Sequence, residues 1–76
     1  MNKARRKALS EVVERLNNLF DELRALCDEE DEYRENMPES LQSSEKYVLS
    51  EDASSFMNDA LDRLSEAIDS IEEAQA

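Results

Sequence analysis

The sequence predicts an all-α protein in which two long helices fold back on each other as an antiparallel hairpin. The 76 residues include no glycine and one proline, so the strong helix breakers are confined to one place. Apolar residues recur at helical spacing on both sides of that proline. A row of alanines, seven residues apart, marks one face of the second helix where another backbone can come close. These alanines are Ala53, Ala60, Ala67 and Ala74.

The first helix is expected over residues 3–35, where the apolar residues form three heptad rows. Two rows suit a two-stranded coiled coil, whereas a third row indicates a helix that touches more than one neighbour. One row turns polar at Glu30, so the apolar stripe weakens toward the end of the helix. The rows are Leu9, Leu16 and Leu23; Val12, Leu19, Leu26 and Tyr33; and Val13, Phe20 and Cys27.

The turn is expected over residues 36–44, because Pro38 disfavours helical backbone at the preceding residue. Two serines could cap the start of the second helix. Ser44 is one candidate, but Ser50 is followed by two acids, which favour the positive N-terminal end of a helix. The sequence therefore favours a loose lead-in over 45–49 and firm helix over 50–74, within one domain that spans 1–76.

A chain this short buries too little apolar surface for high stability without an aid. The single cysteine excludes an internal disulfide, and the lack of histidine removes the usual zinc sites. Self-association is the remaining aid, so we expect a homodimer in which two hairpins form a four-helix bundle; a monomer or a higher oligomer is the alternative. The residues expected in the core or dimer contact are Leu9, Val13, Leu16, Phe20, Leu23, Ala53, Met57, Ala60, Leu64, Ala67 and Ile71.

The net charge of −11 comes from 20 acids against 9 bases. Four of the bases lie within residues 3–7, which an antiparallel hairpin places beside the acidic end of the second helix. An acidic surface repels nucleic acid and anionic membranes and attracts basic partners. No stretch approaches the roughly 20 apolar residues that span a bilayer. We therefore expect a cytoplasmic protein that binds neither nucleic acid nor membrane directly.

The residues for catalysis are missing. There is no histidine, no glycine-rich phosphate loop, and no serine or cysteine with a visible base. Cys27 continues an apolar row and precedes several acids, which oppose thiolate formation, so we expect a buried and inert thiol. The acidic run over 28–32 lacks the spaced ligands and the glycine of a calcium loop. The sequence thus predicts no enzyme, no metal site and no cofactor.

One family resemblance emerges from the turn and the end of the second helix. The turn reads NMPESLQSSE after an aromatic residue, and residues 67–74 read AIDSIEEA. This combination resembles a group of short acidic proteins encoded in bacterial prophages and other mobile elements. Relatives often have glycine where this chain has Ser43 and Ser44. The resemblance implies a helical hairpin of mobile-element origin in a bacterial host cell, and it implies no mechanism.

Two functional hypotheses follow. The first is a protein-binding module for a host or phage protein of basic character, with the turn residues Met37, Pro38 and Leu41 as contacts. The alternative is a nucleic-acid mimic that inhibits a host defence nuclease or another nucleic-acid-binding protein, in the manner of an anti-CRISPR protein. A helix can line up carboxylates at a density comparable to the one charge per about 1.7 Å of B-DNA. The carboxylates expected to form such an acidic face lie near the end of the first helix. They are Asp28, Glu29, Asp31, Glu32 and Glu35.

Overall fold

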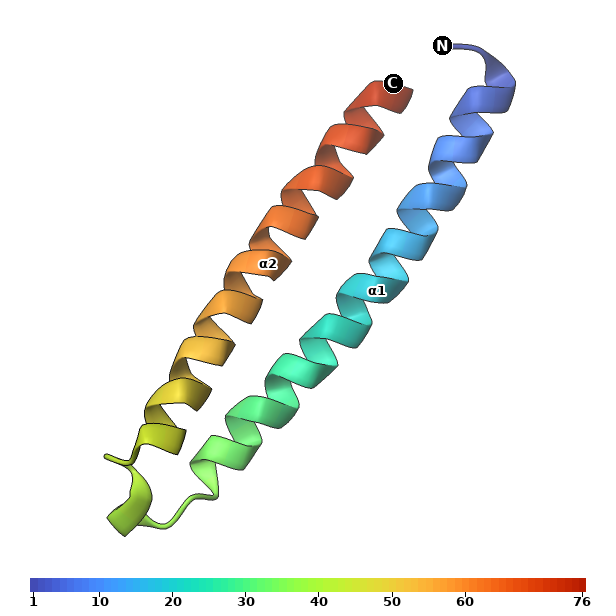
Figure 1. Cartoon of the computed structure of the whole chain (residues 1–76). Coiled ribbons are helices and arrows are strands. Elements are labelled where there is room, and N and C mark those ends of the chain that lie inside the picture. The colour runs from blue at the N-terminus through green and yellow to red at the C-terminus, as the bar shows by residue number, and fades with distance from the viewer.

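The structure, a computed structural model, describes all residues from Met1 to Ala76. It contains helix α1 (Lys3–Glu35), the short 3₁₀ helix η1 (Glu39–Leu41) and helix α2 (Glu45–Gln75). The long helices run antiparallel and side by side, with both termini at one end and the turn at the other (Figure 1). The predicted all-α hairpin of two packed helices is therefore confirmed.

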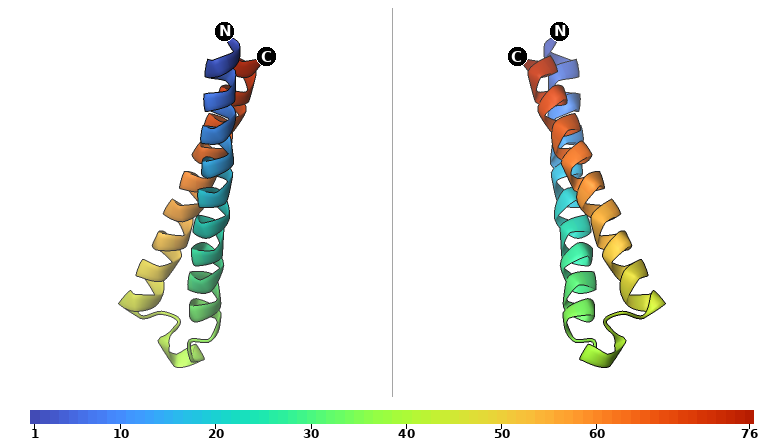
Figure 2. Two further views of the ribbon diagram at one scale, coloured as in Figure 1. Left: turned by 90° about the vertical axis from the view of Figure 1, so that its right-hand side faces the viewer. Right: turned by 90° about the vertical axis from the view of Figure 1, so that its left-hand side faces the viewer.

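The hairpin is a rod rather than a sphere. It measures 59 × 15 × 12 Å, and its radius of gyration is 17.4 Å, whereas a compact domain of this length has a radius of about 11 Å. The helices are inclined to each other, so that in side view they overlap near the termini and separate toward the turn (Figure 2).

Helix α1 begins and ends where the sequence predicts. The Asn2 side chain caps the start, because its Oδ1 accepts a hydrogen bond of 2.7 Å from the backbone N–H of Arg5. The helix ends at Glu35, and the N–H of Asn36 still donates to the carbonyl of Glu32 at 3.0 Å. Pro38 follows with extended backbone and starts the 3₁₀ turn.

The start of α2 differs from the expected one. Ser44, not Ser50, is the N-cap, and its Oγ accepts a hydrogen bond of 3.3 Å from the N–H of Tyr47. Residues 45–49 are regular helix rather than a loose lead-in. Either serine satisfies the local preference for a cap. The earlier start prevails here because it leaves Ser50 inside the helix, buried, where it bonds to α1.

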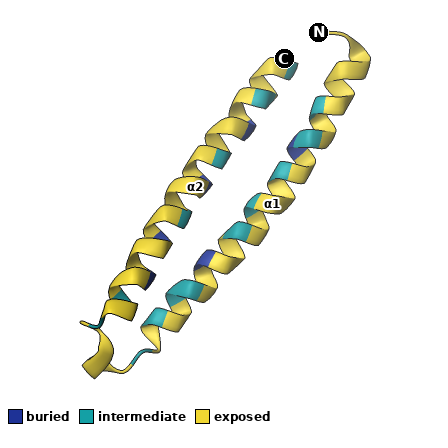
Figure 3. Cartoon of the chain, in the orientation of Figure 1, coloured by how far each residue is buried: buried dark blue, intermediate teal, exposed yellow.

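The contact between the helices is a narrow apolar seam, visible as the inward-facing buried and half-buried residues in Figure 3. Val13 and Cys27 on α1 and Leu61 and Ile68 on α2 are its buried apolar residues. The remaining seam residues are half-buried. They are Leu9, Leu16, Phe20 and Leu23 on α1 and Met57, Leu64 and Ile71 on α2.

The alanine row lies outside this seam. All four alanines are exposed, so they do not mediate the close approach of α1 and α2. The row of α1 that ends at Tyr33 is also mostly exposed, with Leu19 53% and Leu26 56% accessible. One partner helix thus covers two of the three apolar rows of α1, because a third row lies beyond the reach of a single neighbour.

The charged ends of the chain meet without forming ion pairs. The basic residues 3–7 and the acidic end of α2 lie at the same end of the hairpin (Figure 1). The one ion pair within 4.0 Å joins Arg34 and Asp31, at the opposite end. The basic residues 3–7 and the acidic end of α2 therefore attract each other only at longer range, and such attraction is weak between exposed groups.

Candidate functional site

An open cavity of about 620 Å³ lies at the turn end of the rod. This turn cavity sits between the last turn of α1, the 3₁₀ turn and the first turn of α2. Its volume falls in the range of small-molecule and side-chain binding pockets, which is large for a chain of this size. The lining residues are Tyr33, Asn36, Met37, Pro38, Leu41, Ser44 and Lys46.

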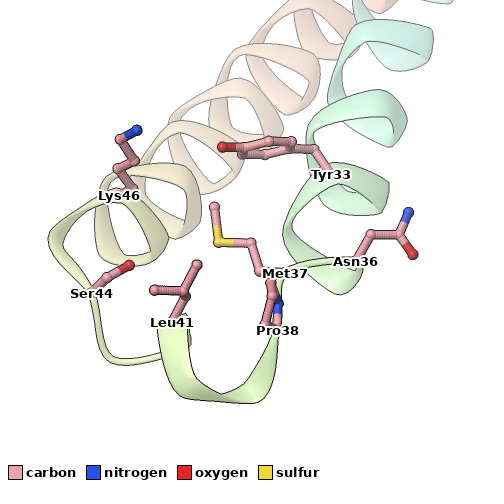
Figure 4. A pocket seen from close by; sticks show the side chains of 7 residues that line it. All are labelled: Tyr33, Asn36, Met37, Pro38, Leu41, Ser44 and Lys46. Atoms are coloured by element: carbon pink, nitrogen blue, oxygen red, sulfur yellow. The ribbon is translucent and has the colours of Figure 1, made fainter.

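The apolar side chains of the turn cavity converge. Figure 4 shows the Met37 side chain rising toward the Tyr33 ring, with Leu41 across the cavity, while the Asn36 side chain points away. Tyr33 is 54% exposed and Leu41 49% exposed, so this end of the molecule presents apolar surface to solvent. All three turn residues singled out from the sequence, Met37, Pro38 and Leu41, line the cavity.

A polar cluster fastens the helices just above the turn cavity. Arg34 reaches from α1 to α2, where its Nη1 donates to the carbonyl of Ser50 at 3.1 Å, to the Ser50 Oγ at 3.2 Å and to the Ser54 Oγ at 2.8 Å. Its Nη2 donates to Asp31 Oδ1 at 2.9 Å. The serines donate in turn, Ser54 to Asp31 at 2.7 Å and Ser50 to Glu30 at 2.6 Å. Both serines are buried, and every hydroxyl has a partner.

This Arg34 cluster was not foreseen from the sequence, although a signal exists. Ser50 and Ser54 continue the heptad rows of Met57 and Leu61 backward, just as Glu30 and Arg34 continue the seam rows of α1 forward. The seam residues of both helices thus become polar at the turn end of the hairpin. Polar groups at matched seam positions specify register, because a slip along the seam would leave them buried without partners.

The cluster also perturbs the ionisation of its charged members. The hydrogen bond from Ser54, followed by that from Arg34, lowers the pKa of the Asp31 carboxyl below its ordinary value. The hydrogen bond to Asp31 raises the pKa of the Arg34 guanidinium. Asp31 and Arg34 are therefore a fixed ion pair at neutral pH.

The lowered pKa of Asp31 predicts an acid-sensitive contribution to stability. In the unfolded chain this carboxyl titrates near about pH 4, and in the folded protein it titrates lower. Its stabilisation is therefore complete above the unfolded pKa and is lost as pH falls through the folded pKa. We expect the urea midpoint of the native chain to exceed that of Asp31→Asn at pH 7, and the difference to shrink by pH 3.

The comparison between variants is needed because acidification also relieves the repulsion among the many carboxylates, which acts in the opposite direction. Asp28→Asn is the matched control, since Asp28 is exposed on the same helix. A gap between Asp31→Asn and the native chain that stays constant from pH 7 to pH 3 would contradict the prediction.

Of the five carboxylates expected in the acidic face, four make no hydrogen bond or ion pair within the protein. Asp28, Glu29, Glu32 and Glu35 are exposed on the last turns of α1, whereas Asp31 is committed to Ser54 and Arg34. Residues 28 and 35 lie about 10 Å apart along a helix. The density of free carboxylates there is therefore on the order of half that of the phosphates in duplex DNA.

Cys27 is buried in the seam and unpaired, as its apolar row predicts. Burial, followed by the charges of Asp31 and Asp28, raises the pKa of its thiol, which disfavours the reactive thiolate. A second, smaller cleft of about 190 Å³ lies beside it, with Arg24, Asp28 and Asn58 among its lining residues. No three acidic or cysteine side chains gather closely enough to hold a metal ion.

Neither helix combines the length and apolar character that a membrane crossing requires. Comparisons of the chain with protein-family models, with curated proteins and with solved structures gave no match. The functional argument therefore depends on the turn cavity, the acidic face and the exposed apolar rows.

Proposed function

We propose that this chain is a non-enzymatic binding module, which recognises a protein partner through the turn end of a rigid acidic hairpin. The observation that supports this most directly is the turn cavity, where Tyr33, Met37 and Leu41 surround a space open to solvent. Apolar side chains that remain exposed around a pocket are typical of protein interaction sites. The proposal includes an origin in a phage or other mobile element, as the resemblance of the turn implies.

The Arg34 cluster supports this proposal by holding the rim of the cavity in place. Arg34 follows Tyr33 directly on α1, and its bonds to Ser50 and Ser54 fix the last turn of α1 against α2. A binding pocket supported by locked side chains loses less conformational entropy when a partner binds. The cavity can therefore receive an apolar side chain of the partner without large rearrangement.

The charge around the cavity defines the chemistry of the partner. Glu32, Glu35 and Glu39 are exposed around the turn end, in a chain of net charge −11. A partner that presents an apolar anchor within a basic surface would gain association rate from the charges and affinity from the anchor. We propose such a host or phage protein as the partner.

The proposed active form is a homodimer. Six of the 76 residues are buried, and none of the large side chains is fully buried, so a single hairpin has little core of its own. Chains of this length with so small a core commonly rely on association. Pairing two hairpins into a four-helix bundle would cover the exposed row of α1.

The test compares capture of protein from a bacterial lysate by variants of the tagged full chain. We expect the double variant Met37→Ser with Leu41→Ser to reduce the captured partner at least about tenfold, because it removes the apolar anchor site. Val48→Ser is the matched control, since Val48 is 48% exposed but lies outside the cavity. Circular dichroism verifies that each variant keeps its helical content. Unchanged capture by the folded double variant would refute recognition through the turn.

A second candidate function, nucleic-acid mimicry, is favoured by the four exposed carboxylates of the acidic face. Charge reversal at Glu29, Glu32 and Glu35 tests it, because all three are free of the Arg34 cluster. A mimic would lose its target on this reversal and would also be displaced by duplex DNA or by RNA added as competitor. A partner held through the turn cavity would associate more slowly after the reversal, because Glu32 and Glu35 attract it, but it would remain bound when DNA or RNA is added as competitor.

A further inference from the structure

The hairpin exposes more surface than a folded monomer of its mass. Its accessible surface is 5874 Å², whereas a typical folded monomer of this mass exposes about 4,800 Å². The excess is thus on the order of 1,100 Å². A standard protein interface removes about 800 Å² from each partner. One such interface would bring the chain close to the surface of an ordinary folded protein.

The two flanks of the hairpin differ in chemistry. On one flank, α1 presents Arg24 and Asp31 and α2 presents Asn58, and these residues share the smaller cleft. The other flank carries the alanine row of α2 and the α1 row made of Val12, Leu19, Leu26 and Tyr33. The turn cavity shows that these two rows lie on the same side of the hairpin. Tyr33 is the last residue of the α1 row, and Lys46, seven residues before Ala53, is in line with the alanine row of α2. Both residues line the turn cavity.

This apolar flank consists of large residues on α1 and small residues on α2. Leu19, Leu26 and Tyr33 are each more than half exposed on α1. On α2, the alanine row is bordered by Leu49, 59% exposed, and Phe56, 73% exposed. Five exposed side chains of this size supply on the order of 600 Å², and the alanines add to that area.

The two rows are also in register. Ser10 contacts Gln75 near the termini and Asp31 contacts Ser54 near the turn. The number of residues from Ser10 to Asp31 on α1 equals the number from Ser54 to Gln75 on α2. The same register therefore holds along the hairpin. In that register Leu19 is level with Ala67 and Leu26 with Ala60, each to within one residue.

We propose that a second copy of this chain docks on the apolar flank, with the large row of each α1 packed into the alanine row of its partner's α2. This inference specifies the surface of the proposed dimer and rests on it. A two-fold axis parallel to the helices produces this arrangement. Each leucine then faces an alanine at the same height, which keeps the four helices at even spacing.

The charges favour the same arrangement. Helix α2 carries nine acids and two bases, whereas α1 carries ten acids and seven bases. Pairing each α1 with a partner's α2 avoids a direct contact between two strongly acidic helices. It also places the basic residues 3–7 of one chain beside the acidic end of the partner's α2. Both turn cavities then lie at the same end of the dimer.

The first experiment measures self-association by sedimentation equilibrium of the full chain. We expect twice the mass of one chain, and a dissociation constant at least about 30-fold higher for Ala67→Glu, which would bury an unpaired charge. Ala25→Glu is the matched control, because Ala25 is exposed on the face of α1 away from both flanks. We expect that control to dimerise within threefold of the native chain.

Cysteine cross-linking tests the arrangement itself, in a Cys27→Ala background. Leu19→Cys and Ala67→Cys are prepared as separate proteins and mixed under mild oxidation. We expect disulfides between the two different proteins, since disulfides need Cα atoms within about 7 Å. Cross-linking of Leu19→Cys mainly with itself would overturn the arrangement, because it would place the two α1 helices in contact.

The outcomes separate this inference from the proposed function. A monomer mass at all concentrations would overturn both the dimer and its docking surface, and capture by the turn cavity would still be measured independently. A dimer that Ala67→Glu leaves intact would overturn the apolar flank as its interface while the dimer stands. A dimer weakened by Ala67→Glu but not by Ala25→Glu, with mixed disulfides, supports the inference.

Discussion

Leu61→Ala is expected to lower the free energy of unfolding by about 2–4 kcal/mol. Leu61 is 7% exposed and lies in the middle of the seam, where Phe20 and Cys27 line the same cleft. Truncation removes apolar contacts and leaves a void between two rigid helices that close it only in part. Domains of this length are stable by roughly 4–11 kcal/mol in total, so the variant should lose a large part of its stability.

Urea unfolding followed by circular dichroism measures this loss. Leu41→Ala is the matched control, because the same truncation occurs at a residue that is 49% exposed in the turn. We expect that control to cost less than about 1 kcal/mol. All variants are compared at one protein concentration, since the stability of an associating chain depends on concentration. Equal losses for the two variants would contradict the placement of Leu61 in the core.

Arg34→Ala is expected to destabilise the protein by roughly 1.5–3 kcal/mol, the range for hydrogen bonds to charged groups. Four hydrogen bonds of 2.8–3.2 Å end at this side chain, and three of them cross to α2. Its loss would leave the buried Ser50 and Ser54 beside two carboxylates with no cation. The turn end should open first, because this cluster is the polar fastening nearest to it.

Two variants isolate the role of the guanidinium. Arg15→Ala changes the net charge equally at an exposed site on the same helix, and we expect a change within about 0.5 kcal/mol. Arg34→Lys keeps the charge but loses the planar fork that bonds several acceptors, so its stability should lie between the other two. Hydrogen exchange of the amides in the first turns of α2 should rise in Arg34→Ala and remain low in Arg15→Ala.

Much of the secondary structure was predictable because its causes are local. The glycine-free composition and the heptad rows fix two long helices, and Pro38 separates them. The bounds of α1 agree with the prediction because Asn2 caps its start and Pro38 limits its end. Burial of Cys27 followed from its row, since a residue in line with Val13 and Phe20 faces the same neighbour.

The start of α2 was not predictable from the local sequence. Ser44 and Ser50 are both suitable caps, and the two acids after Ser50 favoured the later one. What decides between them is distant in the chain. In the structure Ser50 lies inside α2, and its hydroxyl bonds to Glu30 and Arg34 across the hairpin rather than capping the helix.

Part of the candidate site was likewise predictable from the sequence, and part depends on the fold. Met37, Pro38 and Leu41 were identified from an unusual apolar turn, and they do line one cavity, but Tyr33 and Lys46 join them only because the hairpin closes. Asp31 was assigned to the acidic face by its neighbours in sequence. The structure turns it toward Ser54, a residue that sequence spacing alone does not connect to it.

The sequence by itself determined the two helices, the turn between them and the acidic character of the surface, because propensity, periodicity and charge act over a few residues. Only the tertiary structure decided the register, the Arg34 cluster and the contrast between a polar and an apolar flank. These features depend on which residues of α1 lie level with which residues of α2. That pairing follows from the packing of both seams at once, and no segment carries it alone.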